Sequence, residues 1–198
     1  MNTENINWAE NVVLVDGDYL DKVAFDLTVN FERMLERRIP QADLPHWIDC
    51  IALDGGLREG DNNVQVMFIH QKGSLKNFNP SGYEEINRKA FKDTIAEFEM
   101  SAYPVENIVS KDDFFIQVLG LLKNEKEIKR LMIVPDIANI NNVKHELRDA
   151  DEKNITVFAM QPITGGNFRQ EILGYSLMSA LGITASEIEK KQADRLGD

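Results

Sequence analysis

Three carboxylates stand where two predicted strands end. The apolar run at residues 12–15 leads directly into Asp16 and Asp18, and the apolar run at residues 131–134 leads into Asp136. Strands that are apolar on both faces lie inside a parallel sheet, so these two runs should be parallel neighbours that bring Asp16 and Asp136 to one edge. Ligands bind at that edge of open α/β sheets, and Mg²⁺ or Mn²⁺ prefers oxygen ligands. The residues therefore define a candidate metal site for activating water against a phosphodiester.

The same side chains also fit a structural role as helix caps. A carboxylate at a helix N-terminus accepts hydrogen bonds from the first backbone N–H groups. Asp16 and Asp18 precede a helical pattern, Ser110 and Asp113 have capping-box spacing, and Asp136 precedes apolar residues at helical spacing. Capping does not require the carboxylates to meet, so their convergence distinguishes the two interpretations.

A second candidate site is a glycine turn near the C-terminal end. Gly165, Gly166 and Asn167 precede a helix predicted at residues 168–181, and Arg169 lies at its start. Free backbone N–H groups at a helix N-terminus can hold a phosphate. The alternative is a plain turn with an asparagine cap.

The histidines and the cysteine give no recognised catalytic or metal motif. The spacing of His46, His70 and His145 matches no metal-binding pattern, and each fits a structural role. Cys50 falls within a strand predicted at residues 47–53 and fits an inert buried thiol. A single cysteine excludes an internal disulfide and favours a reducing, cytoplasmic location.

The elements that position these residues alternate between strands and helices. Apolar patterns predict strands at 12–15, 47–53, 64–69, 96–103, 131–134 and 155–160, and helices at 20–35, 110–122, 137–147 and 168–181. This order predicts an α/β fold, a three-layer sandwich with a mainly parallel, Rossmann-like sheet. The turn residues between 47–53 and 64–69 predict an antiparallel hairpin at the sheet edge. Residues 71–85 fit an exposed loop with room for a short helix at its end.

Length and charge limit the range of functions. With 198 residues and 43% hydrophobic side chains, the chain can form one core, so we expect a flexible lead-in at 1–10, a single α/β domain at 11–183, and a short helix and charged tail at 184–198. The net charge of −11 repels polyanions and anionic membranes. No stretch approaches the roughly 18 apolar residues of a membrane span, and the acidic N-terminus resembles no targeting signal.

The order of these motifs resembles the NYN/PIN-like nuclease domains over most of residues 11–160. The resemblance rests on three motifs: the apolar strand that leads into Asp16-Gly17-Asp18, the Ser-Lys-Asp-Asp helix start at 110–113, and the segment Met132-Ile133-Val134-Pro135-Asp136. The resemblance implies a PIN-like fold. It also implies that Asp16, Asp136 and either Asp112 or Asp113 hold Mg²⁺ or Mn²⁺, with Asp18 beside them, for cleavage of RNA.

Departures from the family pattern favour a scaffold without catalysis. Tyr19 stands where the family has asparagine, Pro135 replaces a glycine, and Ala138 replaces the last acidic residue. The preferred hypothesis is therefore a cytoplasmic NYN/PIN-like scaffold that acts by binding or assembly. The alternative is a divergent Mg²⁺- or Mn²⁺-dependent ribonuclease, and RNA is a partner only under that alternative.

The last predicted helix suggests what such a scaffold would bind. Apolar and small residues spread around much of the circumference of residues 168–181, so this helix needs burial on more than one side. Either the sheet and a neighbouring helix of the same chain cover it, or it forms the contact of a homodimer.

Overall fold

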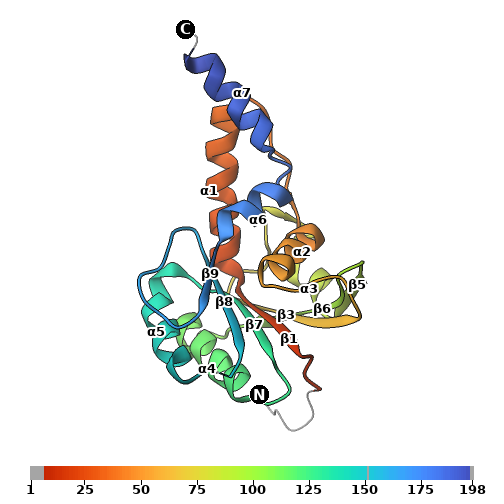
Figure 1. Cartoon of the computed structure of the whole chain (residues 1–198), viewed down its shortest axis with the longest axis vertical. Coiled ribbons are helices and arrows are strands. Elements are labelled where there is room, and N and C mark those ends of the chain that lie inside the picture. Colours follow the sequence, from red (N-terminus) through yellow and green to blue (C-terminus); the bar gives the residue numbers. More distant parts are fainter. Residues whose placement is uncertain (1–6, 151, 197–198) are drawn as a thin grey trace.

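A mainly parallel sheet, covered by helices on both faces, forms the centre of the molecule in the computed structural model, which describes residues 7–150 and 152–196 (Figure 1). Within these residues the sheet has seven strands in the order β5-β6-β3-β1-β7-β8-β9. In chain order they are β1 (Asn11–Asp16), β3 (Asn62–His70), β5 (Lys89–Lys92), β6 (Ala96–Pro104), β7 (Arg130–Val134), β8 (Asn154–Ala159) and β9 (Arg169–Ile172). A separate small sheet pairs β2 (Ala42–Asp43) with β4 (Phe78–Asn79). The predicted three-layer α/β sandwich is confirmed.

The helices form the two outer layers. One layer packs on the core that contains Val13 and Val15, and it consists of α1 (Gly17–Leu35), α2 (Leu44–Asp54), α3 (Tyr83–Ile86) and α6 (Leu173–Ala180). The other layer packs on Val12 and Leu14, and it consists of α4 (Lys111–Asn124) and α5 (Ile140–Glu146), with the 3-10 turns η1 (Ile137–Asn139) and η2 (Leu147–Asp149). Because β1 buries side chains on both faces, its run is apolar throughout.

The predicted pairing of the two most apolar strands is confirmed. β1 lies parallel to β7, with Val12 opposite Leu131 and Val15 opposite Val134. The six parallel strands follow the order of a doubly wound fold, which reverses direction between β1 and β7. The carboxyl ends of these two strands therefore flank the crevice in which such folds bind ligands.

The predicted strand at residues 47–53 is wrong, because these residues form helix α2. Asp43 caps the helix by accepting a hydrogen bond from the His46 backbone at 3.0 Å, and Pro45 lies in its first turn. The predicted hairpin with residues 64–69 is therefore also wrong, since β3 pairs in parallel with β1 and β6. An antiparallel edge hairpin does exist, but it joins β5 to β6.

The predicted helix at 168–181 is wrong in its first part. Residues 169–172 form β9, which extends the sheet beside β8, and α6 begins only at Leu173. α6 buries Leu173, Ser176 and Leu177 within its own chain, and Tyr175 remains 71% exposed. The intrachain interpretation therefore accounts for most of its apolar surface.

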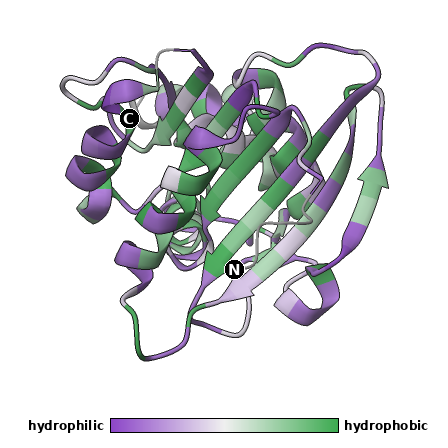
Figure 2. Ribbon diagram, turned by 90° about the horizontal axis from the view of Figure 1, so that it is seen from below, coloured by the Kyte–Doolittle hydropathy of each residue, from purple (hydrophilic) through white to green (hydrophobic). Residues whose placement is uncertain are grey.

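β6 alternates between a buried and an exposed face, as predicted, and α3 is the short helix at the end of the segment 71–85. The predicted exposure of that segment is wrong, because Leu75 and Phe78 are buried in the core and β4 lies within it. Trp8 packs on the α4–α5 side of the core, while residues 1–6 of the predicted lead-in and 197–198 of the tail lie outside the described residues. Coloured by hydropathy, the central strands are hydrophobic over much of their length (Figure 2). Among the described residues, no helix is long and apolar enough to cross a membrane.

Helix α1 extends well beyond the sheet and meets the last helix there. α7 (Ala185–Leu196) lies beside its outer end (Figure 1). Arg37, just after α1, donates two hydrogen bonds to the Glu187 carboxylate, at 2.5 and 3.0 Å. Lys191 reaches Glu36 at 2.5 Å. These ion pairs join the chain's last helix to its first.

Candidate carboxylate site at the sheet edge

Asp16, Asp18 and Asp136 lie at the carboxyl edge of the sheet, and backbone N–H groups use oxygens of all three. Asp16 ends β1 and caps α1 by accepting from the Tyr19 backbone at 3.0 Å. Asp18 does not cap a helix; it accepts from the Gln71 and Lys72 backbones, at 2.9 and 3.2 Å, and so fixes the chain after β3. Asp136 caps η1 by accepting from Ala138 at 2.9 Å.

A lysine lies among these carboxylates. Lys111, the first residue of α4, places its Nζ 2.8 Å from Asp16 Oδ1 and 3.7 Å from Asp18 Oδ2. The Lys111 side chain is 13% exposed, and those of Asp16 and Asp18 are 2% and 9% exposed. This ammonium group lies where a cation bound to Asp16 and Asp18 would lie.

Burial and charge act in opposite directions on this pair. Burial raises the pKa of Asp16, and the hydrogen bond and positive charge of Lys111 only partly offset that rise. Burial acts to lower the pKa of Lys111, but Asp16, Asp18 and Asp136 raise it above its usual value. The lysine is therefore held in its charged form.

The other predicted ligands, Asp112 and Asp113, make structural contacts instead. Asp112 contributes its backbone carbonyl, which accepts from the Asn139 side chain at 3.1 Å. Asp113 is exposed, and its backbone N–H donates to the cap residue Ser110 at 3.0 Å. Among the described residues, no group of three or more His, Cys, Asp or Glu side chains is arranged to hold a metal ion. The donor set at the edge therefore does not fit a divalent metal while Lys111 is in place.

A buried aromatic pair supports the segment that Asp18 fixes. His70 hydrogen-bonds through Nδ1 to the Lys72 carbonyl at 2.6 Å and stacks on Tyr83, with ring centroids 3.6 Å apart. Burial lowers the pKa of His70, so the ring is neutral at neutral pH. The Tyr83 hydroxyl is buried without a hydrogen-bond partner and lies against Gly17, where a Cβ would collide with it.

The glycine turn does not precede a helix. Gly165 and Gly166 have positive φ angles of 77° and 104° and lead into β9, so no helix N-terminus faces a ligand there. Asn167 donates to the Arg148 carbonyl at 3.3 Å, and Arg169 donates to the Asp54 carbonyl at 3.2 Å and pairs with Glu171 at 3.0 Å. The predicted phosphate site required a helix N-terminus after this turn, and the turn leads into a strand instead.

One polar cluster was missed because its helix was taken for a strand. On α2, His46 and Cys50 are one turn apart, with Nε2 and Sγ separated by 3.8 Å, and Ser179 Oγ of α6 is 2.8 Å from the same Nε2. In a strand these two side chains would be too far apart to meet. Cys50 is half-buried on this helix, so its predicted place in a buried strand is wrong. Burial raises the pKa of its thiol, which favours the neutral form.

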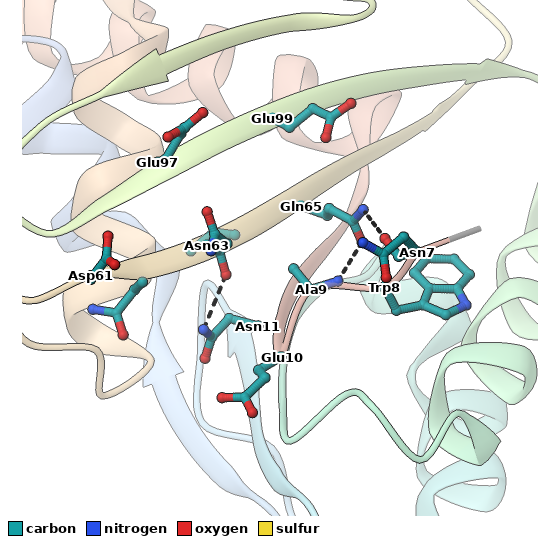
Figure 3. A pocket seen from close by; sticks show the side chains of 12 residues that line it. Asn7, Trp8, Ala9, Glu10, Asn11, Asp61, Asn63, Gln65, Glu97 and Glu99 are labelled. Carbon is teal, nitrogen blue, oxygen red and sulfur yellow. Dashed lines mark hydrogen bonds between the residues drawn. The ribbon is translucent and has the colours of Figure 1, made fainter. Parts of the chain in front are cut away.

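An acidic hollow of about 570 Å³ lies at the opposite edge of the sheet (Figure 3). Its wall carries the carboxylates of Glu10, Asp61, Glu97 and Glu99. The Gln65 side chain fixes the entering chain, donating to the Asn7 carbonyl at 3.0 Å and accepting from the Ala9 backbone at 3.1 Å. The hollow therefore repels anionic ligands.

The strand order and the carboxylate edge together define a Rossmann-like α/β protein. By sequence the chain belongs to a family of unknown function, DUF6621, whose family model matches residues 5–188. Comparison with curated proteins and with solved structures gave no match.

Proposed function

We propose that this protein acts by binding or assembly on a NYN/PIN-like scaffold, without metal-dependent catalysis. The observation that supports the proposal is the position of Lys111 between Asp16 and Asp18, at 2.8 and 3.7 Å. An ammonium group neutralises carboxylates as a cation does, but it has no open coordination position for water or a phosphate oxygen. The edge would thus keep the electrostatic balance of a metal centre without its chemistry.

The negative charge of the chain also disfavours a nucleic-acid substrate. The chain carries a net charge of −11, and four carboxylates line the hollow of about 570 Å³ at the amino ends of β1, β3 and β6. Because binding to RNA depends on neutralising phosphates with lysine and arginine, this surface is unsuited to it.

A second copy of the chain is the partner that we propose. On α1, Phe25 and Val29 are one turn apart and therefore share a face, and they are 53% and 37% exposed. Both residues lie in the middle of α1, the helix that extends beyond the sheet (Figure 1). An isologous contact between two such helices would bury these side chains.

A divergent ribonuclease is the alternative, favoured by the meeting of Asp16 and Asp136 at one edge. The two strands that they follow are neighbours, and the charge of Asp136 raises the pKa of Asp16. Removing Lys111 would then leave a carboxylate pair that attracts a divalent ion.

A metal titration distinguishes the two functions. We expect Mg²⁺ and Mn²⁺ to leave the melting temperature of the wild-type protein unchanged, and Lys111→Ala to be stabilised by either ion, because its carboxylates have lost their cation. Single-stranded RNA should remain intact with the wild-type protein and either ion. RNA cleavage that requires metal and disappears in Asp16→Asn would refute our proposal and support the ribonuclease.

A further inference from the structure

A hollow of about 180 Å³ lies at the amino ends of β7, β8 and β9, and we call it the β7–β9 hollow. It is lined by Arg130, Lys153, Asn154, Ile155, Thr156, Asn167, Phe168 and Arg169. None of the described lining residues is acidic, and three side chains are cationic, of which Lys153 already donates to the Glu125 and Ile128 carbonyls at 2.5 and 2.6 Å. The chain has 33 acidic and 22 basic side chains, so a hollow with basic and no acidic lining residues is unexpected.

Strand register brings the polar side chains to one face of the sheet. In the parallel pairs, Arg130 lies opposite Asn154, and Arg169 lies opposite Thr156. Residues opposite one another, and residues two apart in one strand, point to the same face. Arg130 and Arg169 therefore flank β8 on the face that α2 covers.

The two guanidinium groups converge above the C-terminal end of α2. Nη1 of Arg130 and Nη1 of Arg169 lie 2.8 and 3.1 Å from the position that a Cβ of Gly56 would take. Arg130 also donates to the Gly55 carbonyl at 2.6 Å, which holds its side chain in place. Burial lowers the pKa of Arg130, and the positive charges of Arg169 and Arg58 lower it further. Glu171 pairs with Arg169 at 3.0 Å, whereas Arg130 has no carboxylate partner among the described residues, so the positive charge of this cluster is balanced only in part.

Helix capping explains only part of this arrangement. Arginines near a helix C-terminus interact favourably with its last carbonyls, and Arg58 and Arg130 do so here. Capping does not require Asn154 and Thr156 to line a hollow beside those arginines. A small anion in the hollow would relieve the repulsion between them.

We propose that the β7–β9 hollow binds a single phosphoryl group, as inorganic phosphate or a small phosphomonoester. Arginine presents a planar set of donors that matches two oxygens of a phosphate. The volume is below the roughly 300 Å³ at which pockets accept drug-sized ligands, so a whole nucleotide would not be enclosed. This site is on the opposite edge of the sheet from Asp16 and is independent of the function proposed above.

The test is thermal unfolding and calorimetry of the full chain with inorganic phosphate, glycerol 3-phosphate and sulfate, with sodium chloride at matched ionic strength. We expect saturable binding of the phosphates, with a rise in melting temperature of roughly 5–10 °C at a hundredfold excess over Kd. Tighter binding of glycerol 3-phosphate than of phosphate would identify the organic ester as the ligand, and the reverse would identify the free ion.

Matched arginine variants decide whether the hollow is responsible. Arg169→Gln and Arg130→Gln should each weaken phosphate binding about tenfold or more, since each removes a charge-assisted hydrogen-bond donor. The exposed Arg33→Gln on α1 should leave it unchanged. Arg169 is 57% exposed, so its replacement leaves the fold intact even if Arg130→Gln unfolds. The proposal is overturned if chloride gives the same shift as phosphate, or if Arg169→Gln binds phosphate like the wild type.

Discussion

The ammonium nitrogen of Lys111 lies 2.8 Å from Oδ1 of Asp16, although 95 positions separate the two residues in the chain. Both side chains are nearly buried, and the interaction joins the start of α4 to the end of β1. Because an unpaired buried charge is costly, each residue depends on the other.

We expect Lys111→Met to destabilise the protein by about 3–5 kcal/mol, because it leaves Asp16 and Asp18 without their cation. The melting temperature should fall by roughly 10 °C for a chain of this size. Denaturant unfolding of Lys111→Met, Asp16→Asn and the double variant measures the coupling between the residues, which we expect to reach about 1–3 kcal/mol. The exposed Lys22→Ala serves as the control and should leave the melting curve nearly unchanged, since surface ion pairs contribute little. Additive single effects would show that the pair is not coupled.

A second prediction concerns pH and a pair of carboxyl groups outside the sheet edge. Burial, a hydrogen bond to Asp93 and the charges of Asp93 and Asp43 raise the pKa of Asp49 to about 7. The folded protein therefore binds more protons than the unfolded chain between about pH 4 and pH 7, so this group makes stability fall as pH rises through that window. Asp49→Asn should flatten this part of the curve, as measured by urea unfolding at several pH values. A curve that is equally steep in the variant would show that the raised pKa of Asp49 is not the cause of the pH dependence.

The third prediction concerns the buried hydroxyl of Tyr83. Because it has no hydrogen-bond partner, Tyr83→Phe should be neutral or should stabilise the protein by up to about 1 kcal/mol. Gly17→Ala should be destabilising, since its Cβ would collide with the hydroxyl and lie 3.1 Å from Cζ. Tyr83→Phe should then recover much of that loss in the double variant, as measured by thermal unfolding. Strong destabilisation by Tyr83→Phe alone would reveal a partner for the hydroxyl.

The fourth prediction tests assembly through α1. If Phe25 and Val29 form the contact between two copies, light scattering should report a dimer at tens of micromolar for the wild-type protein and a monomer for Phe25→Glu. Tyr175→Glu provides a matched control, because Tyr175 is also exposed but lies on α6. A wild-type monomer at that concentration would remove the self-association that we propose.

The central part of the fold could be predicted because local sequence determines it. The runs at 12–15 and 131–134 are apolar on both faces, which only interior strands can be, and both proved to be parallel neighbours. The caps formed by Asp16, Ser110 and Asp136 are likewise local, because each acts on a backbone N–H two or three residues away.

The errors arose where short apolar runs fit two kinds of element. In residues 47–53, the buried side chains Trp47, Ile48, Ile51 and Ala52 recur at helical spacing, and Pro45 lies in the first turn of the same helix. Residues 169–172 form a strand because β8 offers them a pairing edge, which no local pattern reveals.

The key residue of the carboxylate edge could not be identified from sequence. Lys111 stands in a predicted helix start, and nothing near it in the chain indicates that its side chain turns toward β1. Only long-range packing brings Lys111 to Asp16. The sequence therefore identified the acidic residues of the site but not the lysine that pairs with them.

The outermost strands limit the ways in which two molecules can join. β5 and β9 end the sheet on its two sides, each is four residues long, and their exposed residues include Lys89, Lys92 and Arg169. Short edges that carry charged side chains are poor templates for adding a strand from another chain. Growth of the sheet from one molecule to the next is therefore disfavoured on both sides.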